Sequence, residues 1–169
     1  MRVLQVPRER RSRLKPQVLK DLAKRADVKT MFDADQLEIE NDEKPENEWV
    51  AEQVALALIH GFPPAKAWKL FNDEFYMETM DLGQIMRRKE KAITRQKGRI
   101  IGAQGLAKAK LEDLSDCAIA VDGDNVYLLG RFEDLKLAKE AITRLLEGIN
   151  HNTVFAFLEK EQKKRRALL

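Results

Sequence analysis

The sequence predicts an α+β protein in which one order of elements occurs twice: a strand, a basic segment, a helix, two strands and a long helix. Four short segments alternate apolar and polar residues as β-strands do, at 28–32, 36–40, 117–121 and 126–129. Each pair of segments flanks a short turn and precedes a long helical pattern, over 48–60 and 131–147. The chain is therefore a degenerate internal repeat of roughly 60 to 70 residues.

The first half begins with a strand over 2–6, which ends at Pro7. The segment 8–15 is basic. Pro16 then suits the first position of a helix, because its fixed φ is helical and its missing N–H is not needed there. Apolar residues at helical spacing extend this helix to about Asp27.

The strand pair of the first half leads into an acidic loop over 41–47. The helix over 48–60 follows, and Gly61 is a natural C-terminal cap. A second, shorter helix begins at the proline pair before Ala65, and we interpret residues 63–79 as a helical connector between two domains.

In the second half we expect a strand over 80–86, a basic stretch from Arg87, and a helix over 106–116 after a glycine-rich segment. The final helix carries one apolar stripe and ends at Gly148. Residues 149–158 have no clear pattern, and we expect the basic tail over 159–169 to be frayed.

The most informative segment is the run from Gly98 to Gly105, which is basic and apolar and ends in a glycine pair at GxxG spacing. Glycine has no Cβ, so such a loop brings backbone N–H groups against a sugar-phosphate backbone. A GxxG loop between two helices, followed by two strands and a helix, is the layout of a KH domain, a module that binds single-stranded RNA. The fold expected is two type I KH domains (βααββα) in tandem, each a three-stranded antiparallel sheet packed against three helices.

The domain boundaries follow from this layout. Residues 1–62 form a degenerate KH domain, because its loop (Ser12–Pro16) lacks glycine, and residues 80–158 form the KH domain with the GxxG loop.

Composition agrees with a soluble nucleic-acid-binding protein. The net charge of the 169 residues is only +3, but basic residues cluster over 2–25, 87–110 and 160–166, and acids over 33–52. Cys117 is the single cysteine, which excludes an internal disulfide and a cysteine-based zinc site. Without an apolar leader or a long apolar run, we expect an intracellular protein with no membrane partner.

Enzyme classes are disfavoured. The sequence contains no GxxxxGK[ST] phosphate loop, GxGxxG fingerprint, HExxH pair or nucleophile elbow. Paired acids such as Asp122 and Asp124 lie in expected turns, where aspartate is common for backbone reasons. We therefore expect no catalytic residues, no metal and no cofactor.

The ordered motifs resemble the "partner of Nob" family, tandem-KH ribosome-assembly proteins of archaea and eukaryotes. The resemblance rests on Val6-Pro7, on His60-Gly61-Phe62 with the helix after it, on residues 73–82, on the glycine run, and on 126–130 with the end of the last helix. It implies a non-catalytic small-subunit assembly factor that binds single-stranded rRNA near the rRNA 3′ end. It also implies work beside the Nob endonuclease, with the rRNA adenine dimethyltransferase and the alpha subunit of initiation factor two as further partners. A member would be cytoplasmic in archaea, and both nuclear or nucleolar and cytoplasmic in eukaryotes.

The RNA-binding residues expected from the second domain comprise the loop, its basic flanks and an apolar floor. They are Arg95, Lys97, Gly98, Arg99, Ile100, Ile101, Gly102, Ala103, Gln104, Gly105, Leu106, Lys108, Lys110 and Ile119. The two middle loop residues are uncharged where the family often has Lys or Arg, which puts the salt-dependent affinity on the flanking cations.

A protein-interaction scaffold is the rival interpretation. In that case the first domain docks a protein and RNA binding is secondary. The candidate interaction residues are Arg10, Arg11, Arg13, Glu38, Glu40 and Glu43.

Overall fold

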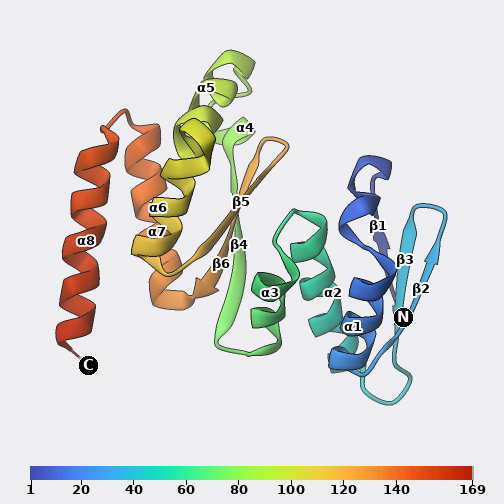
Figure 1. The fold of residues 1–169 in the computed structure, drawn as a ribbon. Coiled ribbons are helices and arrows are strands. Elements are labelled where there is room, and N and C mark those ends of the chain that lie inside the picture. Colours follow the sequence, from blue (N-terminus) through green and yellow to red (C-terminus); the bar gives the residue numbers. More distant parts are fainter. Residues whose placement is uncertain (169) are drawn as a thin grey trace. The chain divides into compact units, whose positions relative to one another are not determined.

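The computed structural model describes residues 1–168, so Leu169 of the expected tail lies outside the described residues. The chain divides into two compact units, one of residues 1–75 and one that begins at Tyr76 (Figure 1). Across residues 1–168, none of the helices combines the length and apolar character that crossing a membrane requires.

The first unit contains one three-stranded antiparallel sheet in the order β1-β3-β2. Its elements are β1 (Arg2–Gln5), the 3₁₀ helix η1 (Arg8–Arg13), α1 (Pro16–Ala26), β2 (Lys29–Asp33), β3 (Gln36–Glu40), α2 (Pro45–Ile59), α3 (Pro64–Ala67) and the 3₁₀ helix η2 (Trp68–Phe71). Alternate side chains of the central strand β3 point to opposite faces of the sheet. Leu37 and Ile39 are fully buried on the face that the helices cover, while Glu40 on the other face is exposed.

The second unit repeats this order and adds a helix. Its sheet has the order β4-β6-β5. Its elements are β4 (Phe75–Asp81), α4 (Leu82–Ile85), α5 (Glu90–Ile101), the 3₁₀ turn η3 (Ala103–Gly105), α6 (Leu106–Ser115), β5 (Ala118–Asp122), β6 (Asn125–Arg131), α7 (Phe132–Leu146) and α8 (His151–Ala167). The expected fold class, two units with three-stranded antiparallel sheets and helices, is confirmed.

The expected strand over 80–86 was wrong. The strand ends at Asp81 and the short helix α4 follows, because the Asp81 carboxylate accepts a hydrogen bond from the Gln84 N–H at 3.1 Å and caps the new turn. Helix α2 likewise begins at Pro45 rather than residue 48, since proline occupies its first turn. Both differences arise from residues at helix starts, a capping aspartate and a first-turn proline, which an apolar pattern does not reveal.

The structure also differs from the expected connector and tail. Helices α3 and η2 lie against α2 within the first unit, and β4 already occupies most of the rest of 63–79. Residues 151–167 form one continuous helix, α8, whose Val154, Phe155 and Leu158 are buried. A basic composition suggested fraying, but these apolar side chains supply the burial that orders the helix.

Polar contacts fix both ends of α8. The Asn150 side chain accepts from the Thr153 N–H at 2.9 Å and caps the first turn. Near the other end, the Arg165 guanidinium pairs with Asp134 at the start of α7. Because α8 lies along α6 and its later residues reach Asp113 and Asp116 at the end of α6, the two helices run parallel.

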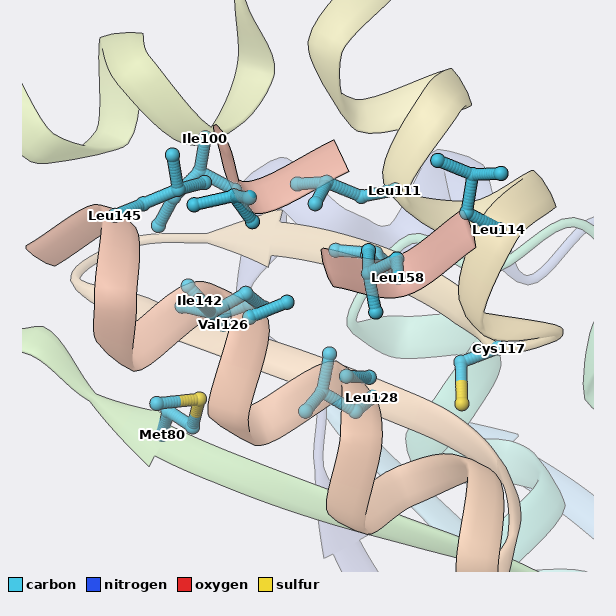
Figure 2. Packing of buried hydrophobic residues seen from close by; sticks show 14 of the residues in the cluster. Met80, Ile100, Leu111, Leu114, Cys117, Val126, Leu128, Ile142, Leu145 and Leu158 are labelled. Atoms are coloured by element: carbon cyan, nitrogen blue, oxygen red, sulfur yellow. The ribbon is translucent and has the colours of Figure 1, made fainter. Parts of the chain in front are cut away.

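The core of the second unit gathers side chains from the sheet and from helices α4, α5, α6, α7 and α8; Figure 2 shows part of this packing. Ile100, Val126, Leu128, Ile142 and Leu145 are completely buried. Burying one such side chain contributes about 1.5–3 kcal/mol to folding, so this cluster is the main source of the unit's stability.

Cys117 lies in this core, just before β5, and is 3% exposed. Burial raises the pKa of its thiol to about 12. Its sulfur packs against Gly130 of β6, where an added Cβ would lie 2.7 Å from Sγ. Cys117 is therefore a packing residue of the core.

We predict that the Cys117 thiol is a reporter for unfolding of the second unit. The raised pKa lowers its thiolate fraction about a thousandfold relative to an unperturbed cysteine at pH 8. A thiol-specific disulfide reagent should then react slowly with native protein and rapidly in denaturant. Equal rates in both states would show that the site is open.

Candidate nucleic-acid interface

The glycine loop of the second unit joins the end of α5 to the start of α6. Gly102 and Gly105 have φ angles of 73° and 74°, in the left-handed region that favours glycine. Between them, Ala103 and Gln104 are exposed, and Gln104 also has a positive φ of 56°. The loop thus presents backbone without large side chains, as a phosphate cradle requires.

The two glycines serve different purposes. A Cβ on Gly102 would lie 2.5 Å from the Ala107 Cβ and 2.9 Å from the Ala107 backbone nitrogen. A Cβ on Gly105 would meet nothing within 4 Å. Gly102 therefore lets the ends of α5 and α6 approach closely, whereas Gly105 leaves the loop surface open to a ligand.

The basic flanks are partly engaged within the unit. Lys97 Nζ lies 3.9 Å from Asp124 in the β5–β6 turn, and Lys108 Nζ lies 3.0 Å from Glu112. Lys110 Nζ sits 4.7 Å from the ring centroid of Phe155, while Arg95 is exposed on α5. Surface ion pairs of this kind contribute at most about 1 kcal/mol, so these lysines can exchange partners for a phosphate.

Arg99 differs from the other cations, and here the structure corrects the sequence-based expectation. Its guanidinium donates hydrogen bonds to the carbonyl oxygens of Leu145, near the end of α7, and of Ile149, at 2.8 Å. The last carbonyls of a helix have no partners within it and carry its partial negative charge. Arg99 is therefore a structural clamp on α7 rather than a free phosphate ligand.

The first unit contains the same clamp. Arg13 Nη1 donates to the Ile59 carbonyl oxygen, at the end of α2, at 2.6 Å. Donor and acceptor are 46 residues apart in both units. The long helix of each half is thus tied to the segment that precedes the loop position.

The expected apolar floor is only partly available. Ile100 is completely buried and Ile119 is 3% exposed, so both belong to the core. Ile101 is partly buried and Leu106 is 66% exposed beside the loop. Only the latter two can offer apolar surface to a base, because Ile100 and Ile119 face inward.

A hollow of about 310 Å³ lies on the side of the loop that faces α8. Gly102, Ala103 and Lys110 line it together with His151 and Phe155 of α8. His151 Nε2 lies 2.7 Å from the Arg99 carbonyl oxygen, which links the first turn of α8 to the helix that leads into the loop. Helix α8 therefore packs next to the glycine loop and holds the end of α5 through His151.

The first unit has no comparable loop. Its 3₁₀ helix η1 replaces the longer helix α5, and Leu14, at the loop position, is 5% exposed. The Arg11 guanidinium lies 5.9 Å from the Phe32 ring centroid, and Arg13 is bound to α2 as described. The loop position of the first unit therefore holds a buried leucine and no glycine, so it lacks the glycine backbone that the second unit exposes.

The acidic candidates of the first unit lie around a hollow of about 270 Å³ at the end of β3. Glu40 and Glu43 line it with Asp27 and Asp42, and Glu38 lies two residues earlier on β3. Arg10 lies on η1, outside this hollow. A role for these residues in protein binding stays a prediction.

Comparison with known proteins identifies the family. A family model described as a eukaryotic-type KH domain (KH-domain type I), from the second KH domain of PNO1, matches residues 76–163, more than half of the chain. A KH domain-containing protein of Methanocaldococcus jannaschii is 33% identical over 96% of this chain and 74% of its own length. The chain belongs to the PNO1/Dim2 family.

Other members support this assignment. The RNA-binding protein pno-1 of Caenorhabditis briggsae is 31% identical over 60% of the chain, which spans 38% of that longer protein. The structure of a complex of a/eIF2alpha, aDim2p and rRNA from Pyrococcus horikoshii contains a chain that matches with a TM-score of 0.85 and 30% identity, over 96% of this chain and 94% of that one. The resemblance to the "partner of Nob" family drawn from the sequence is therefore confirmed.

Sequence reasoning missed two contributors to the interface. Helix α8 gave no clear pattern in its first turns, yet His151 and Phe155 stand behind the loop. Glu112 was also missed, although its spacing of four from Lys108 predicts their ion pair. Glu112 also accepts a hydrogen bond from the Ile119 N–H of β5 at 3.0 Å, a contact that depends on tertiary packing and leaves no local signal.

We predict that Arg99→Met destabilises the second unit by about 2 kcal/mol, because two charged hydrogen bonds to backbone carbonyl oxygens, of Leu145 in α7 and of Ile149 after it, are lost. The urea midpoint for Cys117 exposure should fall, while the salt slope of RNA binding should stay unchanged. Arg13→Met is the matched control and should leave the Cys117 midpoint as in wild type. If Arg99→Met changed the salt dependence of RNA binding but left the urea midpoint unchanged, Arg99 would be an RNA contact and not a structural clamp.

We also predict that Gly102→Ala destabilises the second unit more than Gly105→Ala. At Gly105 the backbone is left-handed helical, where alanine costs about 1 kcal/mol. At Gly102 the φ of 73° and ψ of 175° lie in a region essentially restricted to glycine, and a Cβ would also be forced against Ala107. The same thiol-exposure midpoint measures both variants. Equal losses would mean that the α5–α6 approach tolerates a methyl group.

Proposed function

We propose that this protein is a non-catalytic assembly factor of the small ribosomal subunit, whose second KH unit binds single-stranded rRNA near the rRNA 3′ end. The observation that carries the proposal is the glycine loop itself. It is an exposed GxxG backbone with two positive-φ glycines, inside the segment that matches the PNO1 KH domain.

Three further points support it. The curated relatives are named RNA-binding or pre-rRNA-processing proteins. A similar archaeal chain was solved in a complex with rRNA and a/eIF2alpha. Lys97, Lys108 and Lys110 surround the loop in weak pairs that an RNA phosphate can replace.

The proposal extends to partners. We infer that the bound RNA end is presented to the Nob endonuclease, which would supply the nuclease chemistry, and that the dimethyltransferase acts on the same assembling subunit. An initiation factor two alpha subunit is a further candidate partner, since the complex from Pyrococcus horikoshii pairs a relative with it. In an archaeal cell this work would take place in the cytoplasm.

The scaffold interpretation stays as the second candidate function, and one observation favours it. The first unit keeps the fold but has a buried leucine where the loop would be, and it gathers Asp27, Glu40, Asp42 and Glu43 around one hollow. A surface of that charge would favour a basic protein segment over RNA.

We predict that Ala103→Asp/Gln104→Asp lowers RNA affinity at least tenfold, because two carboxylates at the exposed loop repel phosphate. Fluorescence anisotropy with RNA from the 3′ end of small-subunit rRNA measures it over a salt series, with a scrambled RNA beside it. Lys136→Glu, on α7, changes the net charge by the same amount and is the matched control.

The outcomes separate the two functions. Loss in the loop variant alone, with wild type preferring the 3′-end RNA, supports the rRNA function. Equal RNA affinity of the loop variant and wild type would mean that the loop has only a structural role. The scaffold function would then be the better-supported one.

A further inference from the structure

A hollow of about 310 Å³ lies between α6 and α8, two helices that otherwise pack against each other. The loop and α6 contribute Gly102, Ala103 and Ala107 to its lining, and α8 contributes His151 and Phe155. Because the first three residues have little or no side chain, they leave room between the helices. The volume lies at the small end of the range for ligand pockets, as a site for one planar ring system requires.

The hollow lies on a different side of α6 from strand β5. Lys110 lines the hollow, whereas Glu112, two residues later, accepts a hydrogen bond from the Ile119 N–H of β5. Two residues turn an α-helix by about 200°, so the hollow and β5 are on opposite sides of α6. A nucleotide at the glycine loop can therefore have a neighbour whose base turns toward α8 rather than toward β5.

The lining combines aromatic rings with a cation. The ring centroids of His151 and Phe155 are 6.0 Å apart, and Lys110 Nζ lies 4.7 Å from the Phe155 centroid. Among residues 1–168, none of those that line the hollow is acidic. Unstacked RNA bases bind proteins by stacking on aromatic or histidine rings, and a nearby lysine attracts their phosphates.

The rim of the hollow is open to a ligand. Leu106, which lines it, is 66% exposed, and Lys110 is exposed as well. His151 also supplies a polar atom. Its Nε2 lies 2.7 Å from the Arg99 carbonyl oxygen, which only accepts, so Nε2 is the donor. In the neutral ring Nδ1 is then an acceptor, and every unpaired nucleobase has an N–H group that can donate to it.

We propose that this hollow binds one unstacked base of the RNA strand whose backbone crosses the glycine loop. The proposal rests on the proposed function of the loop. The loop residues Gly102 and Ala103 line the hollow, so a strand held at the loop brings its bases within reach. An apolar side chain of a protein would also fit the volume, but it would use neither the charge of Lys110 nor the Nδ1 acceptor of His151.

The test measures the contribution of single bases to the affinity for RNA from the 3′ end of small-subunit rRNA. One nucleotide at a time is replaced by an abasic residue, which keeps the phosphate, and fluorescence anisotropy gives each loss of affinity. At one position or more, wild type should lose about fivefold or more, as expected for a stacked base. Phe155→Leu should already bind unmodified RNA more weakly by that factor and lose nothing further at this position, because leucine has no ring on which the base can stack.

Phe157→Leu is the matched control. Phe157 lies two residues later on α8, and its ring centroid is 3.8 Å from the guanidinium carbon of Arg144 on α7. This variant loses the same ring outside the hollow, so it should keep the wild-type loss at every position. The midpoint of Cys117 thiol exposure shows whether both leucine variants are folded under the binding conditions.

A second measurement needs only wild type and decides the matter if Phe155→Leu does not fold. RNA that carries 5-iodouridine at one position at a time should, for at least one position, photocrosslink to His151 or Phe155. If wild type binds the RNA but Phe155→Leu shows the same abasic losses, or if no position crosslinks to α8, the hollow does not bind a base and suits a protein side chain better, while the loop function stands. Failure of wild type to bind the RNA overturns both.

Discussion

Each unit depends on an arginine that binds the end of the last helix of its βααββα motif. Arg99 binds one carbonyl oxygen near the end of α7 and one just after it, and Arg13 binds one at the end of α2. Both join the segment after the first strand to the last helix of the motif, so they close the βααββα arrangement. In the second unit the hydrogen bonds of Arg99 hold α5 in place, and α5 leads directly into the glycine loop. The position of the loop therefore depends on these bonds.

The two units separate what the fold requires from what binding requires. The first unit keeps its sheet, its long helix and its arginine clamp but buries Leu14 where the second unit exposes a loop. The second unit adds the close approach of Gly102 to Ala107, and helix α8 behind it. A KH-like unit can thus lose its phosphate cradle while the interactions that close the motif persist.

The sequence was informative where signals are local. Alternation in β2 and β3, the glycine pair, and the stripe of α7 were enough to predict the fold class and the loop. It failed where burial or capping decides: Asp81 ends β4 through its cap, and Arg99 looks like any other loop cation until its helix-end partners are known. Glu112 shows the same limit, since its bond to Ile119 joins two elements that only packing brings together.

The parallel course of α6 and α8 has a mechanical consequence. The C-terminal turns of α8 are held by Arg165, and its first turn is held by His151 against the carbonyl of Arg99. A force applied at the C-terminus, as by a protein-unwinding motor, would peel α8 one turn at a time, starting from Arg165. The His151 contact beside the glycine loop would be the last contact of α8 to open.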